Sequence, residues 1–221
     1  MDPQQRLLLQ VAYHALEDAG HPDDLGRDTG VYVGAMSSDF AVANAAAALS
    51  GTARYPNADL YQLANRISHF LDLTGPSLVV DTACSASGVA LQLAFDALRA
   101  GRVRAAIVGA VNLILHPARR IQYAQQGMLS RRGRCQPFSA AADGMVTSEG
   151  VAALVLRPLR DALADGDHVY GVIRAVGTNT DGRTNGFMVP SPAAQADLIA
   201  ATWRAAGIDP RSLGYIEAHG T

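Results

Sequence analysis

The chain has 221 residues, of which 49% are hydrophobic and 17% are charged, and its formal net charge is −2. This apolar content supports a sizeable core and excludes a disordered chain, and the length fits one large domain or part of one. Acidic and basic residues are mixed along the sequence, which excludes an electrostatic surface for nucleic acid or for an anionic membrane.

Hydrophobic periodicity predicts helices and strands that alternate along much of the chain. In chain order, we expect a helix at 3–20, a strand at 29–36, helix and loop at 37–58, a helix at 59–73, a strand at 76–83, a helix at 87–101, strands at 104–115, 150–156 and 169–179, a helix at 192–206 and a strand at 213–218.

This alternation is typical of an α/β fold with a mainly parallel or mixed sheet. The runs at 104–115 and 150–156 are apolar almost throughout, so we expect both faces of the sheet to be covered there. The helix at 87–101 is apolar almost all round and should be buried. Two long polar loops, at 128–150 and 178–195, are of the kind that often carries function.

One of the two cysteines, Cys84, lies in the stretch VVDTACSASG, where a predicted strand passes into a helix. Free N–H groups and the dipole at a helix N-terminus stabilise a thiolate and hold a developing oxyanion. The alternative is a buried structural thiol, and the sequence pattern leaves both open. The other cysteine, Cys135, forms no disulfide framework with it, which favours a reducing, cytoplasmic location.

His219 follows the predicted strand at 213–218, so it should lie at the same kind of sheet edge as Cys84. A cysteine and a histidine on such edges suit nucleophilic acyl transfer. The histidines show no metal-site spacing, so no metal site is predicted. Phosphate-loop, dinucleotide-binding and serine-elbow motifs are absent from the sequence. No run is long enough to span a membrane, and the N-terminus lacks a signal-peptide pattern.

Several motifs resemble, in order, those of the β-ketoacyl synthase domains of modular type I polyketide synthases. They are MDPQQRLLL, GPSLVVDTACSAS, GAVNLIL, CQPFSAAADGMVTSEG, TNTDGRTNG and IEAHGT. The resemblance implies a thiolase-like layered αβαβα fold and a homodimer of the complete domain. It divides the chain into most of an N-terminal half, at about 1–175, and the start of a C-terminal half, at about 176–221.

The same resemblance implies roles for four residues. Cys84 would take an acyl chain from the 4'-phosphopantetheine arm of an acyl carrier protein, with no cofactor bound directly. His219 would support decarboxylation of a malonyl-type extender, whose carbanion then attacks the Cys84 acyl thioester. Thr221 would hydrogen-bond the pantetheine, and Tyr123 would line the acyl channel.

Parts of the family pattern are not found between Met1 and Thr221. They are the glycine-bearing first strand, the second catalytic histidine in a K-x-x-x-G-H segment, and a glycine-rich oxyanion loop. We therefore expect an internal segment of a longer gene product, without stability or activity of its own.

Two alternatives share this fold. One is a non-elongating module that holds acyl chains without condensing them. The other is a thiolase or a fatty-acid-type condensing enzyme, which DTACSAS and TNTDGRTNG disfavour.

Overall fold

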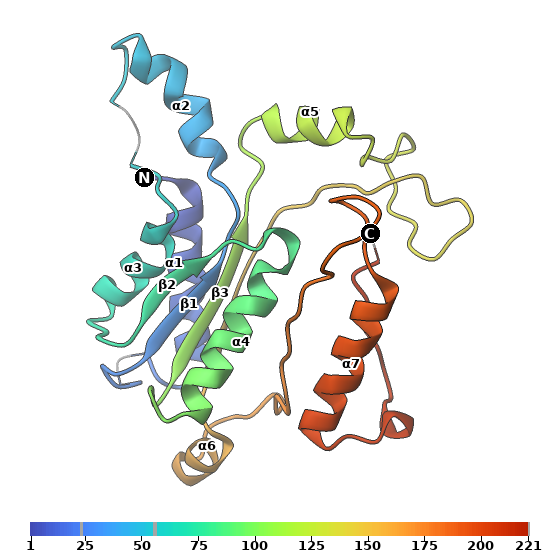
Figure 1. The fold of residues 1–221 in the computed structure, drawn as a ribbon. Coiled ribbons are helices and arrows are strands. Elements are labelled where there is room, and N and C mark those ends of the chain that lie inside the picture. The colour runs from blue at the N-terminus through green and yellow to red at the C-terminus, as the bar shows by residue number, and fades with distance from the viewer. Residues whose placement is uncertain (23, 55–56, 221) are drawn as a thin grey trace.

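The computed structural model describes residues 1–22, 24–54 and 57–220, and Figure 1 shows their arrangement. The elements along the chain are α1 (Pro3–Asp18), β1 (Gly30–Gly34), α2 (Asp39–Leu49), α3 (Tyr61–Phe70), β2 (Ser77–Val80), the 3-10 turn η1 (Ala83–Ser85), α4 (Ala86–Arg99), β3 (Ala106–Asn112), α5 (Ala118–Gln125), β4 (Gly150–Leu156), α6 (Leu159–Asp165), α7 (Pro192–Ala206) and the 3-10 turn η2 (Pro210–Ser212).

The strands form a four-stranded sheet in the order β2-β1-β3-β4. β1 pairs in parallel with β2 and β3, whereas β4 runs antiparallel to β3, with Asn112 opposite Gly150. The carboxyl ends of β1, β2 and β3 therefore meet the start of β4 at one edge of the sheet. This edge is where a site is expected in an open α/β sheet.

Helices α1 and α3 cover one face of the sheet, and α4 covers the other. Helix α1 begins cleanly because the Asp2 carboxylate accepts a hydrogen bond from the Gln4 N–H at 2.8 Å, with Pro3 in the first turn. The core on this face consists mainly of Leu8, Leu16, Val31, Val33, Leu63, Ile67 and Ile107. The alternation of β1 sends the intervening Tyr32 to the other face.

The buried surface of α4 is a single stripe of alanines, Ala86, Ala90, Ala94 and Ala97. Of these, Ala90, Ala94 and Ala97 pack in one cluster with Tyr32 and Val108 of the sheet. The expectation that the whole helix would be buried is wrong, since Leu93 is 38% exposed. Among the described strands and helices, the sheet makes most of the contacts to α4, so an apolar helix is covered mainly on one side.

The expectation of a sheet covered on both faces is also wrong at β4. Ala153 and Val155 pack toward the core beneath α1, but Ala152 is exposed and Leu154 is 51% exposed. Helix α1 contacts one side of the strand, and no helix in the described ranges packs against the other to a comparable extent. A continuous apolar run thus becomes an edge strand with an alternating burial pattern.

Two predicted strands, at 169–179 and 213–218, are absent from the described part of the chain. Both segments carry apolar side chains, but neither forms a ladder with another strand, which is the condition for a sheet. Large side chains in both segments are exposed to solvent, with Tyr170 79% and Tyr215 78% exposed. Between them, α7 has the expected bounds, begun by Ser191 and Pro192 and closed by Gly207 in the left-handed region.

The remaining strands and the helices at α1, α3 and α4 confirm the sequence predictions. Two helices, α5 and α6, were not predicted. The loop at 128–150 is irregular apart from one bridge between Leu129 and Met145, and the Ser130 hydroxyl ties it by donating to Asp143 at 2.6 Å. This hydrogen bond lowers the pKa of Asp143 below its ordinary value.

Candidate active site

Cys84 lies in the tight turn η1 that joins β2 to α4, and its side chain is exposed. The preceding Ala83 adopts φ of 53°, in the left-handed region, and its N–H donates to the Asp81 carboxylate at 3.0 Å. The Ser85 hydroxyl donates to the carbonyl of Thr82 at 2.8 Å. These contacts hold the cysteine on a strained turn at the end of a parallel strand, and the strand-to-helix junction that the sequence predicted is confirmed.

The end of β1 is in backbone contact with the start of α4. A Cβ at Gly34 would lie 2.5 to 2.7 Å from backbone atoms of Ala86 and Ser87, which real structures do not tolerate. Gly34 therefore fixes how closely the helix that follows Cys84 approaches the sheet. Sequence reasoning missed this residue, although a glycine at a strand end is a signal for close backbone approach.

A cavity of about 540 Å³ opens at this sheet edge. Gly34, Cys84 and Ser87 contribute to one wall, and Arg119 and Tyr123 of α5 contribute to another. The segment that leads into β4 completes the lining and contains Thr147, whose buried hydroxyl oxygen has no hydrogen-bond partner in the described structure. Two sequence-predicted residues, Cys84 and Tyr123, thus share one pocket.

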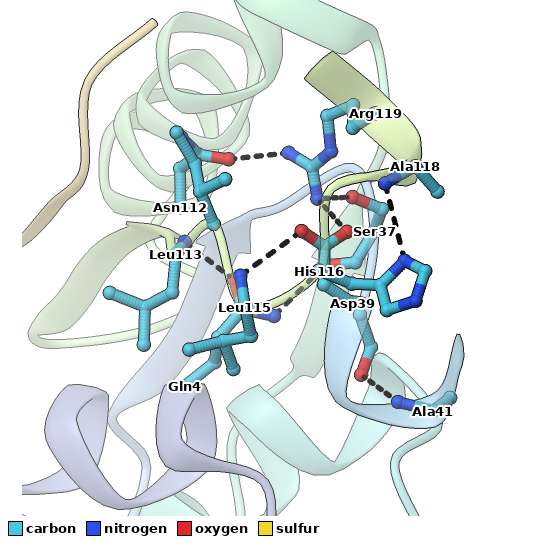
Figure 2. Close-up of polar contacts among 12 residues, drawn as sticks. Gln4, Ser37, Asp39, Ala41, Asn112, Leu113, Leu115, His116, Ala118 and Arg119 are labelled. Carbon is cyan, nitrogen blue, oxygen red and sulfur yellow. Dashed lines mark hydrogen bonds and ion pairs between the residues drawn. The ribbon is translucent and has the colours of Figure 1, made fainter. Parts of the chain in front are cut away.

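A network of polar contacts joins α5 to the sheet edge (Figure 2). The Arg119 guanidinium donates to the Asp39 carboxylate at 2.8 Å, to the Asn112 side-chain oxygen at 2.6 Å and to the Ser37 hydroxyl. Asp39 also accepts from the Leu115 N–H at 3.2 Å. The Arg119 and Asp39 side chains are 10% and 8% exposed, so this ion pair is largely withdrawn from water.

The first residues of the chain belong to the same network. The Gln4 amide donates to the Ser37 carbonyl at 2.9 Å, while its oxygen accepts from the Leu113 N–H at 3.1 Å. Asp2 accepts from the Ser38 hydroxyl at 2.6 Å. Asp2 and Gln4 are each 1% exposed. The polar motif MDPQQR therefore fixes the loops that follow β1 and β3, a role that sequence reasoning did not assign.

The structure does not bring His219 into the Cys84 pocket. His219 is exposed, and an added Cβ at the following Gly220 would lie 3.0 Å from Pro137, so this segment packs on the 128–150 loop. The remaining predicted site residue, Thr221, lies outside the described residues.

Comparison with known proteins identifies the family to which this chain belongs. Residues 1–162 match the family model for the N-terminal domain of beta-ketoacyl synthases, and residues 170–221 match the model for the C-terminal domain. The chain belongs to the β-ketoacyl synthase family. Polyketide synthase PksL of Bacillus subtilis is 42% identical over 230 residues. Polyketide synthase ThaG of Burkholderia thailandensis is 45% identical over 230 residues.

These matches cover 100% of this chain but only 5% and 4% of the two relatives. Among solved structures, the oxazolomycin ketosynthase domain OzmH KS7 of Streptomyces albus JA3453 superposes with a TM-score of 0.95 at 42% identity. The ketosynthase from module 6 of the bacillaene synthase of Bacillus subtilis 168 superposes at 0.91 and 42%. Each superposition includes 100% of this chain, which corresponds to 40% of the first solved chain and 38% of the second. The predicted family and thiolase-like α/β fold are confirmed.

A second charged cluster lies at the opposite edge of the ketosynthase sheet. His21 contacts Asp24 and Asp167 at 2.8 Å each, and these hydrogen bonds, to Asp167 first, raise the pKa of His21. Burial alone would raise the pKa of Asp167, but hydrogen bonds from His21 and Arg157 outweigh it, and the pKa is lowered. This cluster ties the end of α1 to the segment after α6.

Among the described residues, no helix combines the length and apolar character needed to cross a bilayer. Nor do three or more histidine, cysteine, aspartate or glutamate side chains gather there as a metal ion would require.

Proposed function

We propose that this chain forms part of a polyketide synthase ketosynthase domain in which Cys84 carries the acyl chain. The observation that supports this most is the position of Cys84, an exposed thiol on a strand-to-helix turn that opens into a pocket shared with Tyr123. The family membership supplies the reaction class. The donor is an acyl thioester on the phosphopantetheine arm of an acyl carrier protein.

In the first step, the Cys84 thiolate attacks the carbonyl carbon of the acyl thioester. The tetrahedral oxyanion collapses, the pantetheine thiolate leaves and takes up a proton, and Cys84 holds the chain as a new thioester. We assign stabilisation of the oxyanion to backbone N–H groups of the turn that leads from Cys84 into α4, where Ser85 makes no side-chain cap. Tyr123 lines the space that the acyl chain enters.

In the second step, a malonyl-type thioester loses CO₂, and its enolate attacks the Cys84 thioester to form a carbon–carbon bond. The Cys84 thiolate is the leaving group, and the chain grows by the extender's two backbone carbons. We assign His219 to the decarboxylation and Thr221 to the pantetheine. We propose that condensation also uses the second catalytic histidine that the family resemblance implies.

The proposed setting is the cytoplasm, with a homodimer of the complete domain. The outer edge of β2 is unpaired among the described strands, which supports pairing of this edge with a second copy. Residues 1–175 and 176–221 are proposed as parts of the two halves of the domain.

Labelling of the natural full-length protein tests the acyl-carrying role. The protein is incubated with an acyl-pantetheine thioester, and the acylated peptide is located by mass spectrometry. Cys84→Ala should abolish labelling, whereas Cys135→Ala should retain it, although both thiols are exposed. Equal labelling of the two cysteines would contradict the proposal.

A separate measurement tests condensation. With malonyl thioester added, the acylated protein should release CO₂ and form an elongated product, and His219→Ala should lose both while Cys84 is still acylated. Acylation of the wild type without CO₂ release would leave the acyl-holding role in place of the condensing one.

A further inference from the structure

Building on the proposed function, we infer that Arg119 is a positioning residue that sets which acyl chains the Cys84 pocket accepts. It acts through Tyr123, by fixing helix α5 against the sheet edge with its ion pair to Asp39. The chemical class it selects is the acyl chain long enough to reach α5, as opposed to the short chain that stays near the thiol.

Helix α5 lacks the apolar attachment that holds the other helices of the sheet. None of its residues is buried, and Ile121 is 54% exposed. Within the described residues it packs against no strand or helix to the extent that α1, α3 and α4 do. In Figure 1 it stands beyond the end of the sheet. Apolar packing therefore cannot account for its position.

Polar contacts at its first turn provide that attachment (Figure 2). The Ala118 N–H, at the first position of the helix, donates to the His116 ring at 3.2 Å. Arg119 reaches three acceptors on two segments: Ser37 and Asp39, where the chain passes from β1 into α2, and Asn112 at the end of β3. The planar guanidinium uses two nitrogens to reach acceptors on both segments, a spread of donors that the compact ammonium of a lysine does not present.

The attachment and the acyl wall lie on one face of the helix. Tyr123 follows Arg119 by four residues, the spacing of neighbours on a helix surface, and both line the pocket. Loss of the Arg119 anchor lets α5 move and displaces Tyr123. Cys84 is held separately, by the η1 turn and by the contact of α4 with Gly34, so its own geometry does not depend on Arg119.

The test compares Arg119→Gln with Arg27→Gln in the natural full-length protein. The control also removes an arginine from an ion pair with an aspartate, but Arg27 and Asp72 are 66% and 79% exposed and away from the pocket. Each variant is assayed for Cys84 acylation by acetyl- and octanoyl-pantetheine and for Cys84 alkylation by iodoacetamide. The small alkylating reagent reports on the thiol alone.

For Arg119→Gln we expect the KM for octanoyl-pantetheine to rise by about ten-fold or more, because a displaced wall no longer orients the chain. The KM for acetyl-pantetheine and the alkylation rate should stay within about two-fold of the wild type, since the short acetyl group and iodoacetamide bind near the thiol and do not reach α5. Arg119→Lys should fall between, and Arg27→Gln should match the wild type. Adding Tyr123→Ala to Arg119→Gln should cost little more, because both act on one wall.

Equal losses for both thioesters together with slower alkylation would overturn the inference, since that pattern reports general damage. Unchanged octanoyl selectivity would overturn it as well. Should Arg119→Gln fail to fold, Asp39→Asn carries the same test, with a smaller rise in the octanoyl KM expected. A wild type that accepts neither thioester on Cys84 contradicts the proposed function, whereas normal wild-type acylation with an unaltered variant contradicts this inference alone.

Discussion

One wall of the Cys84 pocket, formed by the end of β1 and the start of α4, is built from backbone contact and a packed core. Another wall, formed by α5, is attached by an ion pair that is largely withdrawn from water and by a few hydrogen bonds. On the first wall, Gly34 and the alanine stripe of α4 leave no room for adjustment. On the second, no residue of α5 is buried.

The contrast between the two walls matches two different requirements of the proposed acyl-carrying site. The nucleophile needs a fixed geometry, because small misplacements of reacting atoms slow a reaction strongly. In the proposed function, the wall that would meet the acyl chain can change without disturbing the thiol. A polar attachment permits such a change, because substituting a few side chains can move a helix that has no residue in the hydrophobic core.

The largest effect should come from the packed region. Leu8 is fully buried beneath the sheet, so Leu8→Ala should lower the free energy of unfolding by about 2 to 5 kcal/mol. Ile121→Ala on α5 should change it by no more than about 0.5 kcal/mol, since that side chain is 54% exposed. Chemical denaturation of the two variants measures both. Similar losses would show that α5 is packed after all.

The next effect concerns the contact between β1 and α4. Gly34→Ala places a Cβ against the backbone of Ala86 and Ser87 and should cost about 1 to 3 kcal/mol of stability. It should also slow Cys84 acylation by up to about a hundred-fold, because the turn that carries the thiol must shift. Rate constants for acylation by acetyl-pantetheine give the second value.

Gly88→Ala, on the helix α4 that Gly34 contacts, is the matched control. An added Cβ at Gly88 meets no atom within 4 Å, so the substitution should stabilise the protein by about 0.5 to 1 kcal/mol and leave acylation unaltered. If Gly34→Ala were as harmless as Gly88→Ala, the close backbone contact would not position Cys84.

The smallest effect belongs to the charged cluster far from both walls. Because hydrogen bonds to Asp167 and Asp24 raise the pKa of His21 above its ordinary 6.5, its contribution is complete below about pH 6.5 and is lost as pH rises through the raised pKa. The wild type should therefore lose about 1 kcal/mol or less relative to His21→Gln across this range. Unfolding free energies measured against pH test the slope, and parallel curves would exclude the contribution.

Much of the packed region could be predicted from sequence, because its elements carry their own signals. Short β-branched runs predicted β1 to β4, and apolar stripes predicted α1 and α3. The segments at 169–179 and 213–218 carry the same signal but form no strand among the described residues, because a ladder depends on a partner that the pattern does not reveal. Likewise, the apolar character of Leu154 does not reveal that no helix covers its side of β4.

The polar wall gave weaker signals. Helix α5 has no apolar stripe toward a core, so hydrophobic periodicity cannot find it, yet Pro117 and Gly127 bracket it as a start and a stop. Pro158 and Gly166 bracket α6 in the same way. The ion pair of Arg119 with Asp39 joins residues 80 positions apart, a pairing that one sequence cannot disclose. The position of Cys84 at a strand-to-helix turn was predictable, because the residues that form the turn are neighbours in the sequence.

Added salt should act unequally on the ion pairs of this protein. At physiological ionic strength charges in water are screened beyond about 8 Å, but a pair withdrawn from water is screened far less. The Arg27–Asp72 pair, 66% and 79% exposed, should weaken readily, whereas the Arg119–Asp39 pair, 10% and 8% exposed, should persist. We therefore expect the pocket to keep its shape over a wide range of buffers, so that any salt dependence of acylation measures the encounter with the acyl donor.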